Sequence, residues 1–368
     1  MKIAVDAKVL TYKDLGGIGN YTYNILKTIS QIDKENEYVL CANAPILHKI
    51  NAANFKERYL SFPKDKYFAY IGLPFLFIKE KYDLLFLPTM AMPVFLRPKT
   101  LMVCHDLFID KTSWRKKLFM LFSINYALRR ADKIIADSVS TRNDIVKLCK
   151  IHEENVSVIP LSYDQSLYNL CKDSSLIAKI KNKYKIKGKY LMNVNSILCY
   201  RKNIINQIKA FDIVRKVKKN DIQLIITGKK DNAYDDIMSI VKQLDLQEDV
   251  ILIEHIINED MSVLYSGAEA LMFASSYEGF GLPILEAMAC GCPVLTSKIS
   301  SMPEVAGESA VYVNHLDEND IANMVEKILK DSNLKSSLVS KGLERVKKFN
   351  WERTARVTLE VIMEMVNR

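Results

Sequence analysis

Two glutamates and two glycines share the segment 277–286, which reads YEGFGLPILE. The apolar run over 270–274 before it predicts a buried strand, and the residues from Pro283 onward predict a helix. Glu278 then falls in the turn between strand and helix, and Glu286 lies further along, inside the helix. Glycines let backbone N–H groups approach a ligand, and a helix start offers free donors and a positive dipole end to an anion. We expect a phosphate in this turn, with sugar and ribose hydroxyls on the two carboxylates.

Two cations and an amide, Arg201, Lys202 and Asn203, follow a predicted strand over 190–194 and precede a predicted helix over 206–218. Cations at a helix N-terminus oppose the helix dipole, so their presence is explained if a diphosphate binds there. Lys202 would supply a point charge and Arg201 a bidentate fork. The alternative is two solvated cations without a ligand.

A glycine-rich turn, Gly16-Gly17-Ile18-Gly19, comes soon after the first predicted strand and leads into a helix. Such a turn can place backbone N–H groups near a phosphate. As a dinucleotide-binding fingerprint it is incomplete, because Thr22 stands where the third glycine is expected. The residues alone leave a phosphate-binding turn and a plain tight turn equally open.

His105 and Asp106 end a predicted buried strand over 101–104. A lone histidine is more often structural than catalytic. Ligands of open parallel sheets, however, lie outside the carboxyl ends of the strands. The position therefore favours a functional His105, with Asp106 orienting the imidazole or a neighbouring loop.

Short apolar runs alternate with helical runs along the chain, which predicts parallel sheets with crossover helices. The polar, lysine-rich segment 160–189 divides the series. We therefore expect two Rossmann-like domains, 1–165 and 166–350, and a C-terminal helix within 351–368. The predicted strands are 3–7, 38–41, 84–87, 101–104, 133–136 and 156–159 in the first half, and 190–194, 223–227, 250–253, 270–273, 293–296 and 310–313 in the second.

The 368 residues carry a formal net charge of +9, which favours anionic partners such as nucleotide sugars or phospholipid surfaces. The lysines are dispersed, and no basic stretch is interleaved with stacking aromatics, so we expect no nucleic-acid binding. No apolar run is long enough to span a bilayer, and the seven cysteines show no paired spacing. These features predict a cytoplasmic protein with reduced cysteines.

A predicted helix over 113–130 has basic clusters at 115–117 and 129–130, with apolar residues between them. It could lie on an anionic membrane surface at the inner face of the membrane. It could equally be a crossover helix whose apolar side packs on a sheet. We favour packing for the apolar residues, with the basic ends available to lipid phosphate.

The two glutamates at their spacing, within EGFGLPILEAMACGCPV, resemble the signature of retaining glycosyltransferases of family 4. The resemblance implies an α/β chain of the GT-B fold, in which two Rossmann-like domains face each other across a cleft. The first domain would bind the acceptor, the second would bind the donor nucleotide, and the C-terminal helix would cross back to the first. Further matching segments are VDA at 5–7, GGIGNYT at 16–22, HD at 105–106, ADKIIADS at 131–138, VIP at 158–160, RKN at 201–203, MPEVAG at 302–307 and FNWE at 349–352.

The resemblance also implies roles for the candidate residues. Glu286 would accept hydrogen bonds from ribose hydroxyls, and Glu278 from sugar hydroxyls. His105 would contact the donor sugar and help to position the reacting groups. Arg201 and Lys202 would stabilise the charge that builds on the leaving nucleoside diphosphate, so we expect neither a metal nor a cofactor. The remaining donor-binding residues would be Gly16, Gly17, Asn203, Gly279, Phe280, Gly281 and Leu282.

Substrate identity is less well determined than the reaction class. Some relatives carry an additional arginine where this chain has Asn195-Ser196, which puts the donor in doubt more than the activity. The chain is most similar to bacterial mannosyl- and rhamnosyltransferases of surface polysaccharide synthesis. We therefore expect GDP-mannose as donor, ahead of dTDP-rhamnose and UDP-hexoses, and a glycan or lipid-linked acceptor. The rival interpretations are a nicotinamide-dependent oxidoreductase and a non-catalytic sugar-nucleotide-binding scaffold.

Overall fold

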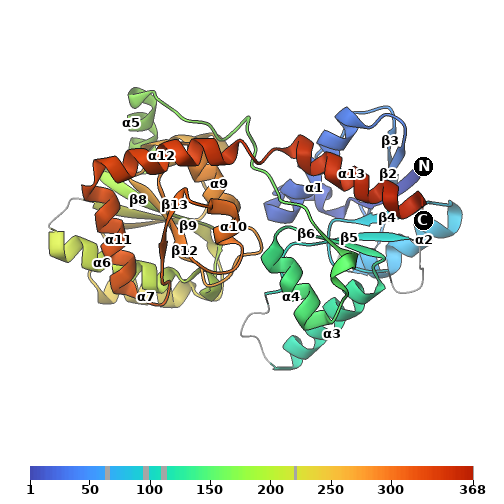
Figure 1. Cartoon of the computed structure of the whole chain (residues 1–368), viewed down its shortest axis with the longest axis horizontal. Coiled ribbons are helices and arrows are strands. Elements are labelled where there is room, and N and C mark those ends of the chain that lie inside the picture. Colours follow the sequence, from blue (N-terminus) through green and yellow to red (C-terminus); the bar gives the residue numbers. More distant parts are fainter. Residues whose placement is uncertain (63–66, 94–98, 109–113, 219–221, 368) are drawn as a thin grey trace. The chain divides into compact units, whose positions relative to one another are not determined.

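The computed structural model describes residues 1–62, 67–93, 99–108, 114–218 and 222–367, and the side chains of 78–79, 114–121, 217–218 and 367 lie outside this description. The chain divides into two compact units (Figure 1). Unit 1 comprises Met1–Leu161 and Trp351–Arg368, and unit 2 comprises Ser162–Asn350. The chain thus leaves unit 1 a few residues before the predicted boundary at 165.

Unit 1 is built on a sheet whose described strands are all parallel, in the order β3-β2-β1-β4-β5-β6-β7. The central strands are apolar and buried on both faces, as expected where crossover helices cover a parallel sheet. The strand order reverses between β1 and β4, and a sheet of this type binds ligands at such a point. The strands are β1 (Lys2–Asp6), β2 (Glu37–Ala42), β3 (Phe55–Tyr59), β4 (Leu84–Leu87), β5 (Thr100–Cys104), β6 (Lys133–Ala136) and β7 (Val156–Val158).

Helices cover both faces of this sheet (Figure 1). α1 buries Tyr21, Ile25 and Ile29 at helical spacing, and α13 packs against it. Hydrogen bonds also fasten α13 to unit 1, since Thr354 Oγ1 donates to the Pro160 carbonyl at 2.9 Å. The helices of unit 1 are α1 (Gly16–Ile32), α2 (Leu73–Lys79), α3 (Trp114–Arg130), α4 (Val139–Cys149) and α13 (Trp351–Asn367), with short turns at η1 (Lys8–Thr11), η3 (Phe68–Gly72) and η4 (Glu153–Asn155).

Unit 2 repeats this topology. Its described strands are also parallel, and their order, β10-β9-β8-β11-β12-β13, reverses between β8 and β11. The strands are β8 (Lys189–Leu198), β9 (Ile222–Lys230), β10 (Val250–Ile253), β11 (Ala270–Phe273), β12 (Val294–Ser297) and β13 (Ala310–Val313).

Three helices of unit 2, α5, α11 and α12, begin after an aspartate whose side chain caps the helix. α11, for example, begins after Asp317, whose carboxylate accepts hydrogen bonds from the N–H groups of Asn319 and Asp320. The helices are α5 (Ser174–Lys183), α6 (Ile204–Lys218), α7 (Tyr234–Gln243), α8 (Asn258–Gly267), α9 (Leu282–Ala289), α10 (Met302–Ala306), α11 (Glu318–Lys330) and α12 (Ser332–Val346), with a 3-10 turn at η5 (Tyr200–Lys202).

The prediction of two parallel-sheet Rossmann-like domains is confirmed, and each of the twelve predicted strands is present. The sequence did not predict β3, a polar strand whose side chains are half-buried or exposed at the sheet edge. The helix predicted over 113–130 is α3, but residue 113 and the side chains of the basic cluster at 115–117 lie outside the described residues. All seven cysteines are free. No helix within the described ranges is long and apolar enough to cross a membrane.

Candidate active site

The core of the site in unit 2 is an ion pair between Lys202 and Glu278. Lys202 ends the 3-10 turn η5, which follows β8, and Glu278 lies in the loop that follows β11. Because β8 and β11 are the neighbours at which the strand order reverses, both residues leave the sheet at its expected ligand-binding point. The fold therefore brings together two side chains that are 76 residues apart in the sequence.

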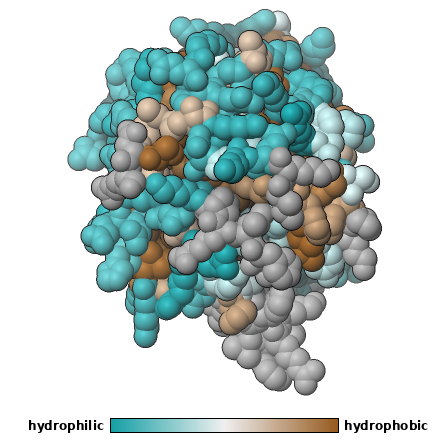
Figure 2. All heavy atoms as spheres, turned by 90° about the vertical axis from the view of Figure 1, so that its right-hand side faces the viewer, coloured by the Kyte–Doolittle hydropathy of each residue, from teal (hydrophilic) through white to brown (hydrophobic). Residues whose placement is uncertain are grey.

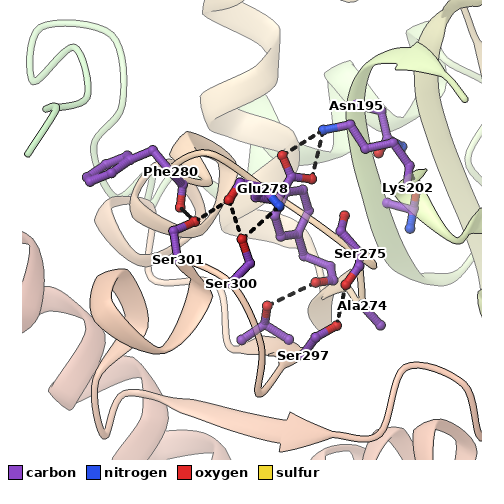
Figure 3. Close-up of polar contacts among 12 residues, drawn as sticks. Asn195, Lys202, Ala274, Ser275, Glu278, Phe280, Ser297, Ser300 and Ser301 are labelled. Atoms are coloured by element: carbon purple, nitrogen blue, oxygen red, sulfur yellow. Dashed lines mark hydrogen bonds and ion pairs between the residues drawn. The ribbon is translucent and has the colours of Figure 1, made fainter. Parts of the chain in front are cut away.

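The pair is bidentate and shielded from water. Lys202 Nζ donates to Glu278 Oε1 at 2.8 Å and to Oε2 at 3.0 Å, and the two side chains face each other in Figure 3. Only 7% of the Lys202 side chain and 8% of the Glu278 side chain are exposed. In such a site the attraction between opposite charges is several times stronger than in water, but removing either partner leaves a buried charge without compensation. The ammonium also lies 5.6 Å from the centre of the Phe273 ring.

A network of buried amides fixes the two loops that carry the ion pair. Gln207 Nε2 donates to the Lys202 carbonyl at 2.9 Å, and Gln207 Oε1 accepts from the Ala274 N–H at 3.0 Å. Asn193 Nδ2 donates to the same Gln207 oxygen and to the Met272 carbonyl, at 2.9 Å each. One side chain thus ties the turn after β8 to the loop after β11, and sequence reasoning missed both Gln207 and Asn193. Their only signal was the presence of polar residues within otherwise apolar elements.

Asn195, where some relatives carry arginine, belongs to this network. Its Nδ2 donates to Asn193 Oδ1 at 2.5 Å and its N–H donates to Thr227 Oγ1 at 3.2 Å. The strand β8 runs on through this position to Leu198, with a change of register between Val194 and Ile197. Asn195 therefore has a structural role within β8, where the register of the strand changes.

Asn203 closes η5 in the left-handed region, with φ of 54°, a conformation that asparagine tolerates better than most residues. Its Nδ2 donates to the Ala274 carbonyl at 3.0 Å and to the His315 carbonyl at 2.6 Å. Both amide hydrogens thus bridge neighbouring loops. Donor binding by Asn203 stays a prediction. For Arg201, the carbonyl accepts from the Ser276 N–H at 2.8 Å, which links η5 to the loop after β11 a second time.

The loop that follows Glu278 is held through its carbonyl groups. Ser301 Oγ lies 2.8 Å from the carbonyl oxygens of both Glu278 and Phe280, which share its one hydroxyl hydrogen. Ser300 Oγ donates to the Glu278 carbonyl at 2.5 Å (Figure 3). Within the described part of the chain, nothing accepts a hydrogen bond from the N–H groups of Phe280, Gly281 and Leu282. These donors stand at the N-terminus of α9, beside the ion pair, which is the arrangement that suits an anion.

Gly281 has a conformational reason for being glycine. It is the N-cap of α9 with φ of 101°, a backbone region that is strained for residues with a Cβ atom. The turn that presents the three N–H groups therefore depends on this glycine. Gly279 is buried in the same loop.

Glu286 lies on α9 and faces two tyrosines instead of the loop. Tyr265 Oη of α8 donates to Glu286 Oε2 at 3.3 Å, and Tyr168 supplies a second hydrogen bond. Burial raises the pKa of the Glu286 carboxyl to about 7, although the two tyrosine hydrogen bonds act to lower it. A carboxylate of this kind can accept further hydrogen bonds from ligand hydroxyls, and its acceptor strength depends on pH near neutrality.

The corresponding edge of unit 1 carries His105, directly after β5. Its Nδ1 lies 2.7 Å from Asp137 Oδ2 and its Nε2 lies 3.2 Å from the Pro88 carbonyl oxygen. The Tyr21 ring stands edge-on to the imidazole at a centroid distance of 4.8 Å. The imidazole is therefore oriented by Asp137, at the end of the neighbouring strand β6, and the expectation that Asp106 orients it is replaced. Burial alone lowers the pKa of His105, but the charge and hydrogen bond of Asp137, together with the Pro88 hydrogen bond and the charge of Asp106, outweigh burial, so the pKa is raised.

Gly16 and Gly17 begin α1 in unit 1. Gly16 has φ of 59°, in the left-handed region that favours glycine. A Cβ atom on either residue would have no atom of the described residues within 4 Å. Packing within the protein therefore does not account for Gly17, whose φ is also ordinary, and space for a ligand next to this turn remains consistent with the prediction.

The predicted site residues thus fall into two groups. Unit 2 contains the larger group, in which the ion pair, Asn203, Arg201 and the loop before α9 are joined by hydrogen bonds, with Glu286 on the adjoining helix. Unit 1 contains His105, Gly16 and Gly17. How the predicted residues of either group contact substrate stays a prediction.

Two family models match the chain, one in each unit. Residues 15–167 match the model described as "Glycosyltransferase Family 4", and residues 177–345 match "Glycosyl transferases group 1". Together the two models leave only the ends and the segment between them unmatched.

Similar proteins of known sequence and structure agree with this result. The chain is 24% identical to O-antigen chain mannosyltransferase B of Escherichia coli over 98% of both chains. It is 28% identical to the serotype-specific mannosyltransferase WbdA of Escherichia coli over 71% of this chain, but it spans only 33% of the length of that relative. HepE of Anabaena, solved in complex with UDP-glucose, superposes with a TM-score of 0.78 at 17% identity, covering 99% of this chain and all of HepE.

Proposed function

The chain belongs to the GT-B glycosyltransferases, and from that premise we propose that it transfers a hexose from a nucleotide-diphosphate sugar to a glycan or lipid-linked glycan. The proposed reaction retains anomeric configuration and needs no metal. Unit 2 would bind the donor nucleotide and unit 1 the acceptor. The product would be part of a bacterial surface polysaccharide.

One observation carries the proposal: the buried Lys202–Glu278 pair lies at the strand-order reversal of unit 2, beside three N–H donors at the start of α9. A nucleoside diphosphate needs cations and backbone donors, and both occur here. Lys202 and Arg201 would neutralise the charge that develops on the leaving diphosphate, and Glu278 would accept from sugar hydroxyls. Glu286, on the same helix, would accept from the ribose.

From the ion pair we also infer how the donor would engage Lys202. In this structure both Glu278 oxygens share one ammonium, which has three hydrogens to donate. A phosphate oxygen placed near Nζ would take one of these hydrogens, and Glu278 would then have acceptor capacity for a sugar hydroxyl. The donor would therefore insert into a preformed pair, which is desolvated before the substrate arrives.

Mannose is the sugar that the relatives favour. The names of WbdA and of O-antigen chain mannosyltransferase B both specify mannosyl transfer, and we infer GDP-mannose as the donor on that basis. HepE supports a nucleotide sugar in a chain of this fold, and its ligand is a uridine compound. The donor base is therefore the first property to measure.

A nucleotide screen tests the donor assignment. Thermal unfolding in the presence of GDP, UDP or dTDP should show the largest rise in Tm with GDP, because a ligand that binds only the folded state stabilises it by mass action. The same screen with Lys202→Ala should show a smaller rise. If none of the three diphosphates raised Tm in the unaltered chain, the proposed donor site would be wrong.

A lipid-linked acceptor would bring this enzyme to a membrane surface. A lipid-linked glycan is held at the inner membrane surface, and the basic composition of unit 1 suits an anionic lipid layer. Figure 2 shows a mainly hydrophilic face with separate hydrophobic patches, the kind of surface on which attachment would depend chiefly on charge. We propose weak, peripheral attachment at the cytoplasmic side.

A further inference from the structure

The two ring nitrogens of His105 both face hydrogen-bond acceptors. Asp137 Oδ2 lies 2.7 Å from Nδ1, and the Pro88 carbonyl oxygen lies 3.2 Å from Nε2. A backbone carbonyl can only accept, so the hydrogen bond to Pro88 requires a proton on Nε2. A second proton is required between Nδ1 and Asp137 Oδ2, because two bare lone pairs at 2.7 Å would repel each other.

The dyad of His105 and Asp137 therefore holds two protons. Imidazole is a stronger base than carboxylate by more than two pK units in model compounds, so the shared proton belongs on Nδ1 and the ring is an imidazolium. A neutral ring that kept its proton on Nδ1 would point the Nε2 lone pair at the Pro88 oxygen. The geometry thus disfavours the tautomer in which His105 could act as a base.

We propose that Asp137 is a positioning residue that keeps His105 doubly protonated through neutral pH, so that Nε2 serves as a hydrogen-bond donor to substrate and never as a general base. The longer contact, to Pro88, is the one that a substrate oxygen would replace. The shorter contact, to Asp137, would persist and hold the ring in place.

The surroundings of His105 support this role. Asp137 is buried, with 2% of its side chain exposed, and its other oxygen, Oδ1, has no partner among the described residues. Tyr21 of α1 is also buried, and its hydroxyl finds no partner in the described structure. Among the described residues, the charged or titratable groups near the imidazole include Asp137, Asp106 on its own loop, the buried thiol of Cys104 at the end of β5, and Tyr21 on α1. Both carboxylates favour the imidazolium, and none of these groups is cationic.

Ring-nitrogen NMR of the full chain tests the charge state without any substrate. The chain has five histidines, and the His105 signals are those that disappear in His105→Gln. At pH 7 we expect both His105 nitrogens to show protonated shifts, with a titration midpoint above that of an ordinary histidine. Asp137→Asn should lower that midpoint, whereas Asp106→Asn, a matched loss of one charge, should move it less. A neutral His105 at pH 7 in the unaltered chain, or an unmoved midpoint in Asp137→Asn, would overturn the proposal.

Activity provides a second readout, and this arm alone rests on the proposed transferase function. Because protonated His105 is the active form, kcat of Asp137→Asn should fall as pH rises from 6 to 8, to about a tenth or less of the value in the unaltered chain at pH 8. Nucleotide binding should not change, because the diphosphate is assigned to unit 2. Asp137→Glu, which keeps the charge, should restore part of the activity if Asp137→Asn folds poorly. Equal pH profiles for Asp137→Asn and the unaltered chain would contradict the positioning role. An inactive unaltered chain with a protonated His105 would contradict only the transferase function.

Discussion

The two units share one strand order, but the oppositely charged pair of each unit comes from different strands of that order. In unit 2 the pair is Lys202 with Glu278, and its members come from the two strands at which the order reverses. In unit 1 the pair is His105 with Asp137, and its members come from the adjacent strands β5 and β6, two steps further along the sheet from the reversal between β1 and β4. Lysine side chains are ordinarily cations throughout the physiological pH range, whereas a histidine depends on its surroundings to be one, and His105 depends on Asp137. One fold thus carries a permanent cation in one unit and a conditional cation in the other.

Net charge also separates the units. Unit 1 contains 27 Lys and Arg against 19 Asp and Glu, and unit 2 contains 25 against 24. Nearly all of the +9 charge of the chain therefore resides in unit 1. Unit 2, the proposed donor unit, relies on a few cations held at the site. Unit 1 instead carries a positive net charge. Cations held at the site act on the chemical step, whereas the positive net charge of a whole unit attracts anionic partners as they approach.

Breaking the Lys202–Glu278 pair should have the largest effect. Lys202→Ala should lower kcat by tenfold to a hundredfold or more, since one electrostatic donor to a developing charge is worth ~3 kcal/mol. The same change leaves Glu278 buried without a partner, which by itself costs about 3–5 kcal/mol of folding free energy.

The double variant Lys202→Ala with Glu278→Gln separates these two effects, because it removes the uncompensated charge. It should recover most of the lost stability in chemical denaturation but none of the activity. Full activity in either variant would remove Lys202 from the site.

Glu286 should show opposite effects on stability and on binding. Its carboxyl has a pKa raised to about 7, above its value in an unfolded chain, so the folded state is stabilised at low pH and loses that advantage as pH rises from about 4.5 through 7. Glu286→Gln should therefore be more stable than the unaltered chain at pH 8, by up to ~3 kcal/mol.

The affinity for the nucleotide should change with pH in the opposite direction to the stability. In the unaltered chain, affinity for the nucleoside diphosphate should rise by about tenfold as pH passes through 7, because ionised carboxylate accepts hydrogen bonds from ribose more strongly. Glu286→Gln should bind weakly at every pH, and Glu278→Ala, the matched control, should bind nearly as well as the unaltered chain. Calorimetry at pH 6 and 8 measures both. Equal affinity for all three proteins would show that Glu286 does not contact the nucleotide.

Alanine substitutions in the two glycine turns should have smaller effects, which differ between the two units. Gly281→Ala places a Cβ atom at φ of 101°, close to Ile284, and should cost about 1–2 kcal/mol of folding free energy. Gly17→Ala meets no atom within 4 Å in the part of the chain that the structure describes, and it should leave stability unchanged or raise it by up to ~1 kcal/mol. If Gly17 admits a ligand, kcat/KM should nevertheless fall by about tenfold. A Gly17→Ala enzyme with normal kcat/KM would make this turn purely structural.

Membrane attachment should be the weakest effect. We expect co-sedimentation with anionic vesicles at low salt and release at high salt, because each Lys or Arg near an anionic surface contributes ~1 kcal/mol and the attraction is screened. Replacing Arg115, Lys116 and Lys117 with Glu should reduce the bound fraction while leaving Tm unchanged. The comparison with neutral vesicles is the control, and equal binding to both kinds would exclude a charge-driven mechanism.

The fold could be predicted largely because burial leaves a clear pattern in the sequence. Apolar strands such as β4 and β11 are covered on both faces, so each appears as a continuous hydrophobic run. The strand β3, FKERY, lies at the sheet edge and buries little, so its polar sequence gave no such signal. Edge strands are held mainly by backbone hydrogen bonds, which any sequence can make.

The site was predicted less completely, because pairing depends on which strands become neighbours. Asp106 adjoins His105 in the sequence, yet the carboxylate that bonds the imidazole is Asp137, 32 residues away. Likewise, the Lys202–Glu278 pair could not be foreseen as a direct contact, although both residues were predicted as site residues. The spacing of residues within one segment can be read from the sequence. Contacts between segments can be predicted only when the order of the strands in the sheet is known.

The return of α13 to unit 1 has a consequence for how the protein is made. Unit 2 is one uninterrupted stretch, whereas unit 1 is assembled from two stretches with all of unit 2 between them. On a ribosome, which releases the chain from its N-terminus, unit 2 can therefore finish folding while unit 1 still lacks the helix that covers α1. Trp351, whose ring lies 6.1 Å from that of Tyr21, is then made after all of unit 2.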